Sequence, residues 1–304
     1  MVSYSTDYSI DDDRILTIHI GFDGVFQIDL GHLTNQTKCL IGFLFHTIDE
    51  GGFVYRNVRP DFIGDRDFIL YEKEGIIESA NGIKFYLKNF NPTIPETFVS
   101  QIHKINDDEN WIDKTIVDIG AAVGESPLYY AALGAKVYAF ELDEYRYKMM
   151  VENIALNPTL AARIIPIHAG IGVDGVIEYY SDPLFIMDST MFMQRFEGHV
   201  MMAEKHNVQG YKLETAIKHF KILEIDLLKV DCKGCEFSIT EQSLKIVQKI
   251  KLEYFKMTRD HDVKKLLDTI HKAGFKTRLY KHHPMTFKSF STNGNIYAEK
   301  TNSS

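Results

Sequence analysis

One string of residues constrains this chain more than any other: an apolar strand that ends in Asp-x-Gly and opens onto a helix. It occupies Ile116–Ser126, and a second apolar string, Lys136–Glu141, ends in a carboxylate about twenty residues after the glycines. Gly120 and Gly124 let the backbone approach a ligand where a Cβ would intrude, and the first turn of the following helix presents unpaired N–H groups. Glu141 is then placed to accept hydrogen bonds from two ribose hydroxyls. The pattern predicts a nucleoside-cofactor site.

The glycine spacing argues against a dinucleotide. A pyrophosphate-binding turn usually has the order G-x-G-x-x-G, whereas here Asp118 stands just before Gly120 and the next glycine is Gly124. A carboxylate at that point would repel a pyrophosphate and would suit the ammonium group of a methionine-type tail. The pattern resembles that of class I S-adenosylmethionine-dependent methyltransferases. The alternative is a Rossmann-like turn that binds another nucleotide or nothing.

A second unusual string crowds acids and lysines at the end of an apolar strand. It spans Ile225–Glu236, and the C-terminal ends of strands are where open α/β sheets place their ligands. Lys229 and Asp231 alternate with apolar residues, so they share one side of the strand. A structural ion pair could explain them, but a polar catalytic edge fits better because Asp118 and Glu141 end neighbouring strands of the same face.

With both strings in view, the chain resembles the FkbM family of S-adenosylmethionine-dependent methyltransferases over roughly residues 80–300. The first string is similar to the family's Asp-x-Gly-Ala-x-x-Gly start, Glu152–Asn157 to its helix end, and Ile225–Glu236 to its Lys-x-Asp-x-Glu-Gly-x-Glu signature. Two positions depart from the family: Lys233 replaces its usual Glu, and Phe255 stands where it often has a His. The leading segment of the chain is not explained by the resemblance.

The residues and the resemblance together give a candidate site. The expected cofactor-binding residues are Asp118, Gly120, Ala121, Gly124, Glu125, Ser126, Glu141, Leu142 and Asp143. A neutral hydroxyl is a poor nucleophile, so methyl transfer to oxygen needs a base or a metal at the acceptor. We expect Asp231 in that role, oriented by Lys229, with Glu236 and Glu253 as second candidates. Mg²⁺ is compatible with these carboxylates, although the metal ligands are not assignable from sequence.

The chain divides into three predicted parts: a mainly-β module over residues 1–90, a linking helix and loop over 91–112, and a methyltransferase domain over 113–304. Short-range alternation before residue 90 predicts strands, and Thr93 and Glu96 have capping-box spacing for a helix through about Ile105. From Thr115 onward strands and helices alternate, which predicts a Rossmann-like parallel sheet with helices on both faces. The expected strands are 115–120, 136–141, 163–168, 223–231 and 250–256, with a closing pair at 275–280 and 295–299; the helices are 125–133, 143–156 and 262–273; and a hairpin turns at 173–176.

Two further features leave alternatives open. Cys232 and Cys235 have CxxC spacing without a second pair or a His cluster, so we interpret them as small residues that fill a strand-to-turn junction rather than as a zinc or redox site. The methionine-rich segment between Ser181 and Gly210 breaks the pattern of strands and helices. It is either a lid over substrate or part of the core.

Composition limits the partners. The net charge of −8 disfavours non-specific nucleic-acid binding, although Gln242–Ser289 carries twelve Lys and Arg against four Asp and Glu, as a solvated surface or a patch for an anionic substrate. No apolar run reaches the ~20 residues of a membrane span, and the N-terminus lacks the order of a signal peptide, so we expect a cytoplasmic protein.

The expected function is methylation of a hydroxyl on a sugar, a glycan or another small molecule, which follows from the resemblance alone. An RNA (tRNA) methyltransferase is the first alternative, and a non-catalytic nucleoside-binding module is the second, favoured by Lys233 and Phe255. The chain is also compatible with a homo-oligomer. Neither the acceptor nor the role of the N-terminal module is indicated by the sequence.

Overall fold

The computed structural model describes residues 7–20, 24–59, 63–106, 110–181, 204–256, 258–281, 290 and 293–301. The chain forms two compact units, Met1–Glu109 with Glu152–Ala161 and Asn110–Val151 with Ala162–Ser304. The segment Glu152–Ala161 therefore packs with the N-terminal unit, although the sequence places it in the cofactor domain. Over the described residues, no helix has the length and apolar character needed to cross a membrane.

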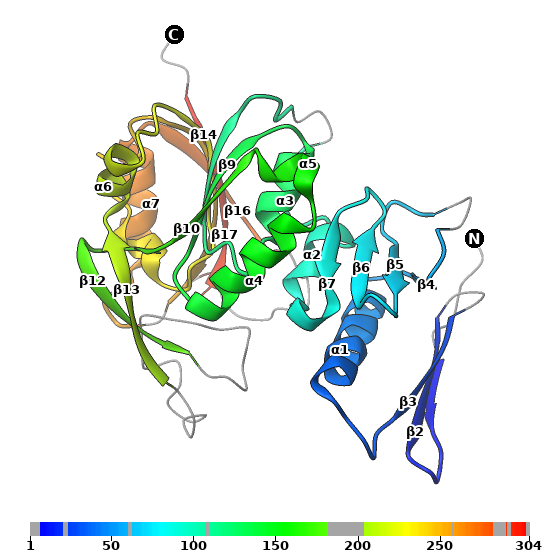
Figure 1. The fold of residues 1–304 in the computed structure, drawn as a ribbon. Helices are drawn as coiled ribbons and strands as arrows, with labels where there is room; N and C mark the ends of the chain where they lie inside the picture. Colours follow the sequence, from blue (N-terminus) through cyan, green and yellow to red (C-terminus); the bar gives the residue numbers. More distant parts are fainter. Residues whose placement is uncertain are drawn as a thin grey trace. The chain divides into compact units, whose positions relative to one another are not determined.

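A seven-stranded sheet forms the centre of the second unit, in the order β10-β9-β8-β14-β15-β17-β16. The parallel strands are β8 (Thr115–Ile119), β9 (Lys136–Glu141), β10 (Ile164–His168), β14 (Ile225–Val230) and β15 (Val247–Phe255), and an antiparallel pair, β16 (Phe275–Tyr280) and β17 (Asn293–Lys300), closes one edge. α3 (Glu125–Ala132) and α4 (Glu144–Ala155) lie on one face, and α6 (Leu213–His219) and α7 (Val263–Lys272) lie on the other (Figure 1). The predicted Rossmann-like α/β fold is confirmed.

The sequence explains the central strands. Val117 of β8, Leu228 of β14 and Ile250 of β15 are fully buried, as expected for parallel strands that are covered on both faces. Leu266 and Ile270 of α7 pack into the same core. The strand order reverses direction between β8 and β14, because β9 and β10 extend the sheet on one side and β15 on the other. Such a switch point leaves a crevice at the carboxyl ends of the strands.

A separate three-stranded sheet of the second unit has the order β11-β13-β12. The strands are β11 (Gly170–Ile171), β12 (Gly175–Ser181) and β13 (Glu204–Tyr211). The predicted hairpin at 173–176 is wrong in its pairing, because β11 and β12 both pair with β13, a strand that the sequence did not predict, and not with each other. The proposed methionine-rich lid falls largely on residues 182–203, which lie outside the described residues.

The N-terminal unit contains two sheets, with helix α1 (Asn35–Asp49) between them in the chain. β1 (Asp7–Ile10), β2 (Ile15–Ile20) and β3 (Gly24–Asp29) form one antiparallel sheet; β4 (Val54–Arg56), β5 (Phe68–Tyr71), β6 (Ile76–Ser79) and β7 (Lys84–Tyr86) form the other. The sequence analysis missed α1. Thr34 caps α1 by accepting a hydrogen bond from the Thr37 N–H, and Phe43 and Leu44 are buried.

The linking helix is shorter than predicted. α2 spans Thr93–Phe98, where the sequence suggested a helix through about Ile105. The Thr93 side chain makes no cap bond and instead donates to the Asn91 side chain, so the capping box does not form. Gln101 has a φ of 53°, a left-handed conformation that does not continue a right-handed helix.

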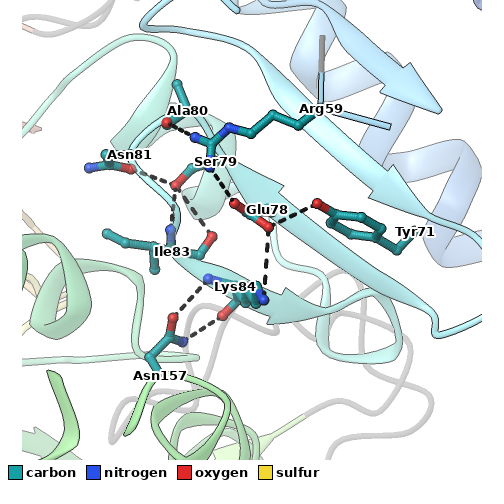
Figure 2. Close-up of polar contacts among 9 residues, drawn as sticks. All are labelled: Arg59, Tyr71, Glu78, Ser79, Ala80, Asn81, Ile83, Lys84 and Asn157. Atoms are coloured by element: carbon teal, nitrogen blue, oxygen red, sulfur yellow. Dashed lines mark hydrogen bonds and ion pairs between the residues drawn. The ribbon is translucent and has the colours of Figure 1, made fainter. Parts of the chain in front are cut away.

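Hydrogen bonds to β7 account for the place of Glu152–Ala161 in the first unit. Asn157 accepts from the Lys84 N–H at 2.9 Å and donates to the Lys84 carbonyl at 2.8 Å (Figure 2), and Asn153 accepts from the Tyr86 N–H at 3.1 Å. The two asparagines thus satisfy backbone groups that an edge strand leaves unpaired. Beside them the buried Glu78 accepts from Arg59 and from the Tyr71 hydroxyl, both at 3.1 Å (Figure 2).

Candidate functional site

The turn between β8 and α3 is shaped by its glycines. Gly120 has a φ of +82°, and a Cβ on it would lie 2.0 Å from the carbonyl oxygen of Asp231, so β14 leaves room only for glycine. Gly124 has a φ of +93° and stands at the N-terminus of α3, where an added Cβ would lie 3.1 Å from the Met150 side chain. The turn therefore lies at the switch point, with the N–H groups of Gly120, Ala121, Ala122 and Gly124 bonded to acceptors within the protein.

Beneath this turn lies a buried ion pair. The Lys229 ammonium is 2.8 Å from Asp118 Oδ1, and the Ser126 hydroxyl donates to Asp118 Oδ2 at 2.6 Å. Burial raises the pKa of Asp118, and the Lys229 ammonium and the Ser126 hydroxyl oppose that rise. Burial acts to lower the pKa of Lys229, but the carboxylates around it outweigh burial and raise it. Asp118 is 0% exposed, so its carboxylate holds the turn together and is not open to a ligand.

Lys229 has a different partner from the one predicted. We expected it to orient Asp231, but its ammonium contacts Asp118 and donates to the Gly120 carbonyl at 3.0 Å and to Ser126 at 3.2 Å. The register of the sheet causes this, because β14 places Lys229 directly opposite Asp118 of β8. Lys229 therefore ties β14 to the turn between β8 and α3.

Glu141 ends β9 beside the turn, as predicted. Its carboxylate accepts from the Ala122 N–H at 2.8 Å and from the Asp143 N–H at 2.9 Å, and the residue is 2% exposed. Burial raises the pKa of Glu141 to about 7, and the charge of Arg146 acts against the shift. A carboxylate has about four acceptor sites, and these two backbone N–H groups use two of them.

The other predicted cofactor residues cluster around the same turn. Ala121 is fully buried, and its N–H donates to the Phe140 carbonyl at 3.0 Å. Glu125 is 3% exposed in the first turn of α3, and its charge helps to raise the pKa of Lys229, after burial and the nearer carboxylates. Leu142 is half-buried against the cluster of Ile177, Tyr179 and Val208, and Asp143 accepts from the Arg146 N–H at the start of α4.

Sequence reasoning missed Ala122 and Arg146 in this region, and it interpreted His168 only as the last residue of a strand. Ala122 has a φ of +44°, a conformation for which an alanine in the sequence gives no signal. Arg146 is 9% exposed and supplies the cation near Glu141. His168 pairs with Glu141 across β10 and β9, lies 3.2 Å from the Leu142 carbonyl through Nε2, and stacks on Tyr147. A histidine at the end of a parallel strand was the available signal for it.

A half-buried cluster of charges lies at the carboxyl ends of β14 and β15, on the predicted acceptor side of the site. The Lys233 ammonium lies 3.5 Å from Asp231 Oδ1 and 3.5 Å from Glu253 Oε1, and the exposed side-chain fractions are 27%, 32% and 32%. Burial would raise the pKa of Asp231, but the charges of Lys233 and Lys229 outweigh it and hold that pKa below its ordinary value. Burial and the charge of Asp231 raise the pKa of Glu253. Of the two carboxyls, Asp231 is therefore the one that loses its proton first.

Glu236, a second catalytic candidate, lies apart from this cluster. It is 0% exposed and accepts from the Gly234 N–H at 2.6 Å and the Phe255 N–H at 2.8 Å. Burial raises the pKa of Glu236 to about 7. The structure thus brings Asp231 and Glu253 together and turns Glu236 toward the backbone of the turn and of β15.

Cys232 and Cys235 are joined by a disulfide, contrary to our interpretation of them as two separate small residues. Within the described ranges, the one group that brings three metal-type donors within 4.8 Å consists of these two cysteines and Glu236. Its sulfur atoms are bonded to each other. The acceptor-side carboxylates, where Mg²⁺ was considered, have the Lys233 ammonium between them instead.

Comparison with known proteins identifies the family. The family model described as Methyltransferase FkbM domain matches residues 118–277, so the resemblance predicted from the sequence is confirmed over that range. The match begins at Asp118 and extends past Glu253. A search of curated proteins finds no match.

The chain is similar to several solved structures, at low identity and low TM-score. They include fibrillarin of Methanococcus jannaschii (12% identity, 98% of this chain and 99% of that chain, TM-score 0.44) and Aeropyrum pernix fibrillarin in complex with S-adenosyl-L-methionine (11%, 97% and 100%, 0.43). A third is precorrin-6y C5,15-methyltransferase of Geobacter metallireducens (14%, 62% and 82%, 0.36). At these scores the likenesses bear on neither the cofactor nor the acceptor of this chain.

Proposed function

Since this chain belongs to the FkbM family of S-adenosylmethionine-dependent methyltransferases, we propose that it transfers a methyl group to a hydroxyl of a sugar, a glycan or another small molecule. One observation carries the proposal. An ionised aspartate, a lysine and a second carboxylate meet at the carboxyl ends of β14 and β15, and the backbone of Asp231 touches the glycine turn. A proton acceptor therefore lies directly beside the predicted cofactor loop.

The cofactor side supports S-adenosylmethionine. Glu141 retains two acceptor sites for ribose hydroxyls, because its two backbone partners use only half of its capacity. Leu142 offers apolar surface next to Glu141, and Gly120 and Gly124 carry no side chain that would block a ligand at the turn. Asp118 acts at one remove: with Lys229 and Ser126 it fixes the Gly120 carbonyl and the start of α3.

The residues on the acceptor side have distinct roles in the transfer. Bound S-adenosylmethionine would supply the methyl group and keep the electron pair of the broken carbon–sulfur bond, and Asp231 would take up the proton of the attacking hydroxyl. Asp231 is ionised because the ammonium groups of Lys233 and Lys229 lower its pKa. Lys233 also places a positive charge next to the oxygen from which the proton leaves, which stabilises the developing negative charge.

The test is transfer of labelled methyl from S-adenosylmethionine to a panel of free sugars, glycosides and tRNA. We expect label in the sugars, and we expect Asp231→Asn to lower kcat by about 100-fold or more while leaving S-adenosylmethionine affinity unchanged. Glu299→Gln, which changes a surface carboxylate paired with Lys249, is the control and should retain the rate. Label in tRNA alone, or full activity of Asp231→Asn, would refute the proposal.

A further inference from the structure

The disulfide between Cys232 and Cys235 flanks Lys233, the lysine of the acceptor-side cluster, on both sides in the chain. It encloses only Lys233 and Gly234, in the turn that connects β14 to the short 3-10 helix η3 (Cys235–Ser238). Both enclosed residues have positive φ, 54° and 128°. A non-glycine residue in this conformation is uncommon and persists where the surroundings hold it. The small ring closed by the disulfide supplies that constraint for Lys233.

The ring determines where the Lys233 ammonium lies. The side chain that meets Asp231 and Glu253, each at 3.5 Å, leaves the backbone from within the ring. Glu236 links the same ring to β15, since it accepts from the Gly234 N–H at 2.6 Å and from the Phe255 N–H at 2.8 Å, two residues after Glu253. A change in the ring is therefore transmitted both to the lysine and to the strand that carries its second partner.

We propose that Cys232 and Cys235 form a thiol–disulfide exchange site for a dithiol reductant, and that the state of this pair sets the position of Lys233 at the acceptor edge. The first part is independent of the methyl-transfer assignment. The second part, control of the reaction, rests on the proposed function. In the oxidised state the lysine is held between the two carboxylates; reduction opens the ring and releases this constraint.

The two sulfur atoms differ in access, which fixes the direction of attack. Cys232 is half-buried, whereas Cys235 is 3% exposed. A thiolate of the dithiol attacks Cys232 Sγ, and the Cys235 sulfur leaves as a thiolate and takes up a proton. The second thiolate of the reductant then attacks the reductant's other sulfur, which is bonded to Cys232 Sγ in the mixed disulfide. This closes the reductant's own disulfide and releases the Cys232 thiolate. The protein gains two electrons and two protons, and the reductant becomes a disulfide.

Glu236 is placed to assist the last step. Its Oε2 lies 3.4 Å from Cys232 Sγ, which is within contact distance for a proton transfer to the released thiolate. Burial raises the pKa of Glu236 to about 7, so a protonated fraction exists near neutral pH. Glu236 thus has a role in the exchange reaction, although it is not placed to act on the methyl acceptor.

A purely structural role fits this disulfide less well. A cross-link between residues three apart removes little conformational entropy from the unfolded chain, because the stabilisation grows with the length of the closed loop. The residues around it are already packed in the core of the second unit, to which Cys235 itself belongs. The bond contributes little to stability but constrains Lys233 in the acceptor-side cluster. It is therefore better suited to a redox switch than to a structural cross-link.

The first test measures the redox equilibrium without any methyl acceptor. The whole chain carries Cys39→Ser, which removes the third thiol. It is equilibrated in buffers of defined reduced-to-oxidised dithiothreitol ratio and alkylated, and mass spectrometry then counts the alkylated thiols. We expect one reversible two-electron transition in the folded protein. A disulfide that is reduced only after the protein unfolds would overturn the proposal. So would a cysteine pair that never forms the disulfide. Zinc retained by the reduced protein would mark the pair as a metal site and overturn it as well.

Linkage supplies the second test. If the ring holds Lys233 against Glu253, then removing Glu253 must change the redox equilibrium by the same coupling. We expect Glu253→Gln to make the disulfide easier to reduce, with the midpoint at an about threefold lower reduced-to-oxidised ratio, as for a partly exposed ion pair. Glu299→Gln, whose partner Lys249 lies on the same strand β15, is the matched control and should not move the midpoint. Equal midpoints for the two variants would overturn the coupling.

The third test compares methyl transfer in the two states. Wild type should change its rate by about fivefold or more across the redox transition, whereas Lys233→Met should give one rate in both states while its cysteines still titrate. A wild-type rate that ignores the redox state would refute the control of the reaction. Absence of transfer in both states, with the redox transition and its Glu253 dependence intact, would refute the proposed function and leave the exchange site established.

Discussion

The buried pair of Asp118 and Lys229 gives the sharpest prediction for stability. Lys229→Met keeps most of the side-chain volume but leaves the Asp118 carboxylate, 0% exposed, without its cation at 2.8 Å. Removing one partner of a buried ion pair costs about 3–5 kcal/mol. For a cooperative unit of 150–250 residues this corresponds to a fall in Tm of roughly 6–20 °C. Lys249→Met, which breaks the partly exposed pair with Glu299, should cost less than about 1 kcal/mol.

The pH dependence of this loss distinguishes an unpaired charge from a packing defect. Without Lys229 the pKa of Asp118 is raised further, because burial is no longer opposed by the ammonium. A carboxyl whose folded pKa is raised contributes stability that is present below its unfolded pKa and is lost as pH rises through the folded pKa. The difference in free energy of unfolding between wild type and Lys229→Met, measured with urea, should therefore increase from pH 4 to pH 8. For the double variant Asp118→Asn/Lys229→Met, the difference from wild type in free energy of unfolding should be smaller and should not change with pH. If Lys229→Met lowers the free energy of unfolding by less than about 1 kcal/mol, or by an amount that does not change with pH, an unpaired buried charge is not the cause of the loss.

Three other predictions concern the site itself. Gly120→Ala should abolish S-adenosylmethionine binding and lower the urea midpoint, because its Cβ would lie 2.0 Å from the Asp231 carbonyl oxygen at a φ of +82°; an unaltered binding isotherm would contradict the close approach. Affinity for S-adenosylmethionine should rise as pH increases through about 7, since burial raises the pKa of Glu141 to about 7 and the ionised form accepts ribose hydroxyls better; titrations at pH 6 and 8 that give equal Kd would count against this role. Methyl transfer should continue in EDTA, because the Lys233 ammonium supplies a cation between Asp231 and Glu253; loss of the rate in EDTA with recovery on adding Mg²⁺ would show a metal there instead.

Local patterns were enough to predict the parts of the site that one segment of chain determines. The strand Lys136–Glu141 has the predicted bounds, and Gly120 and Gly124 shape the turn, because apolar periodicity and glycine placement act over a few residues. The family resemblance followed from the same short strings. Helix α1 was missed although its signals were present, since Thr34 caps it and the apolar run from Cys39 to Phe45 lies inside it.

The contacts that sequence did not predict depend on which strands become neighbours. Lys229 pairs with Asp118 only because β14 lies next to β8 in one register, and no property of either string alone fixes that alignment. Asn153 and Asn157 bond to β7, far away in the chain, so their role in the helix-end motif was invisible locally. The disulfide lies in a turn with two successive positive φ values, a geometry that CxxC spacing does not reveal.

The most direct test of the account is isothermal titration of the purified protein with S-adenosylmethionine, beside Glu141→Ala and the surface control Glu144→Ala. We expect micromolar binding to wild type and to Glu144→Ala, whose carboxylate pairs only with Lys148 at the surface in the described structure. Glu141→Ala should bind roughly 10–100-fold more weakly, because two hydrogen bonds to ribose hydroxyls are lost. No binding to wild type, or equal binding to Glu141→Ala, would contradict the assignment of this turn as the cofactor site.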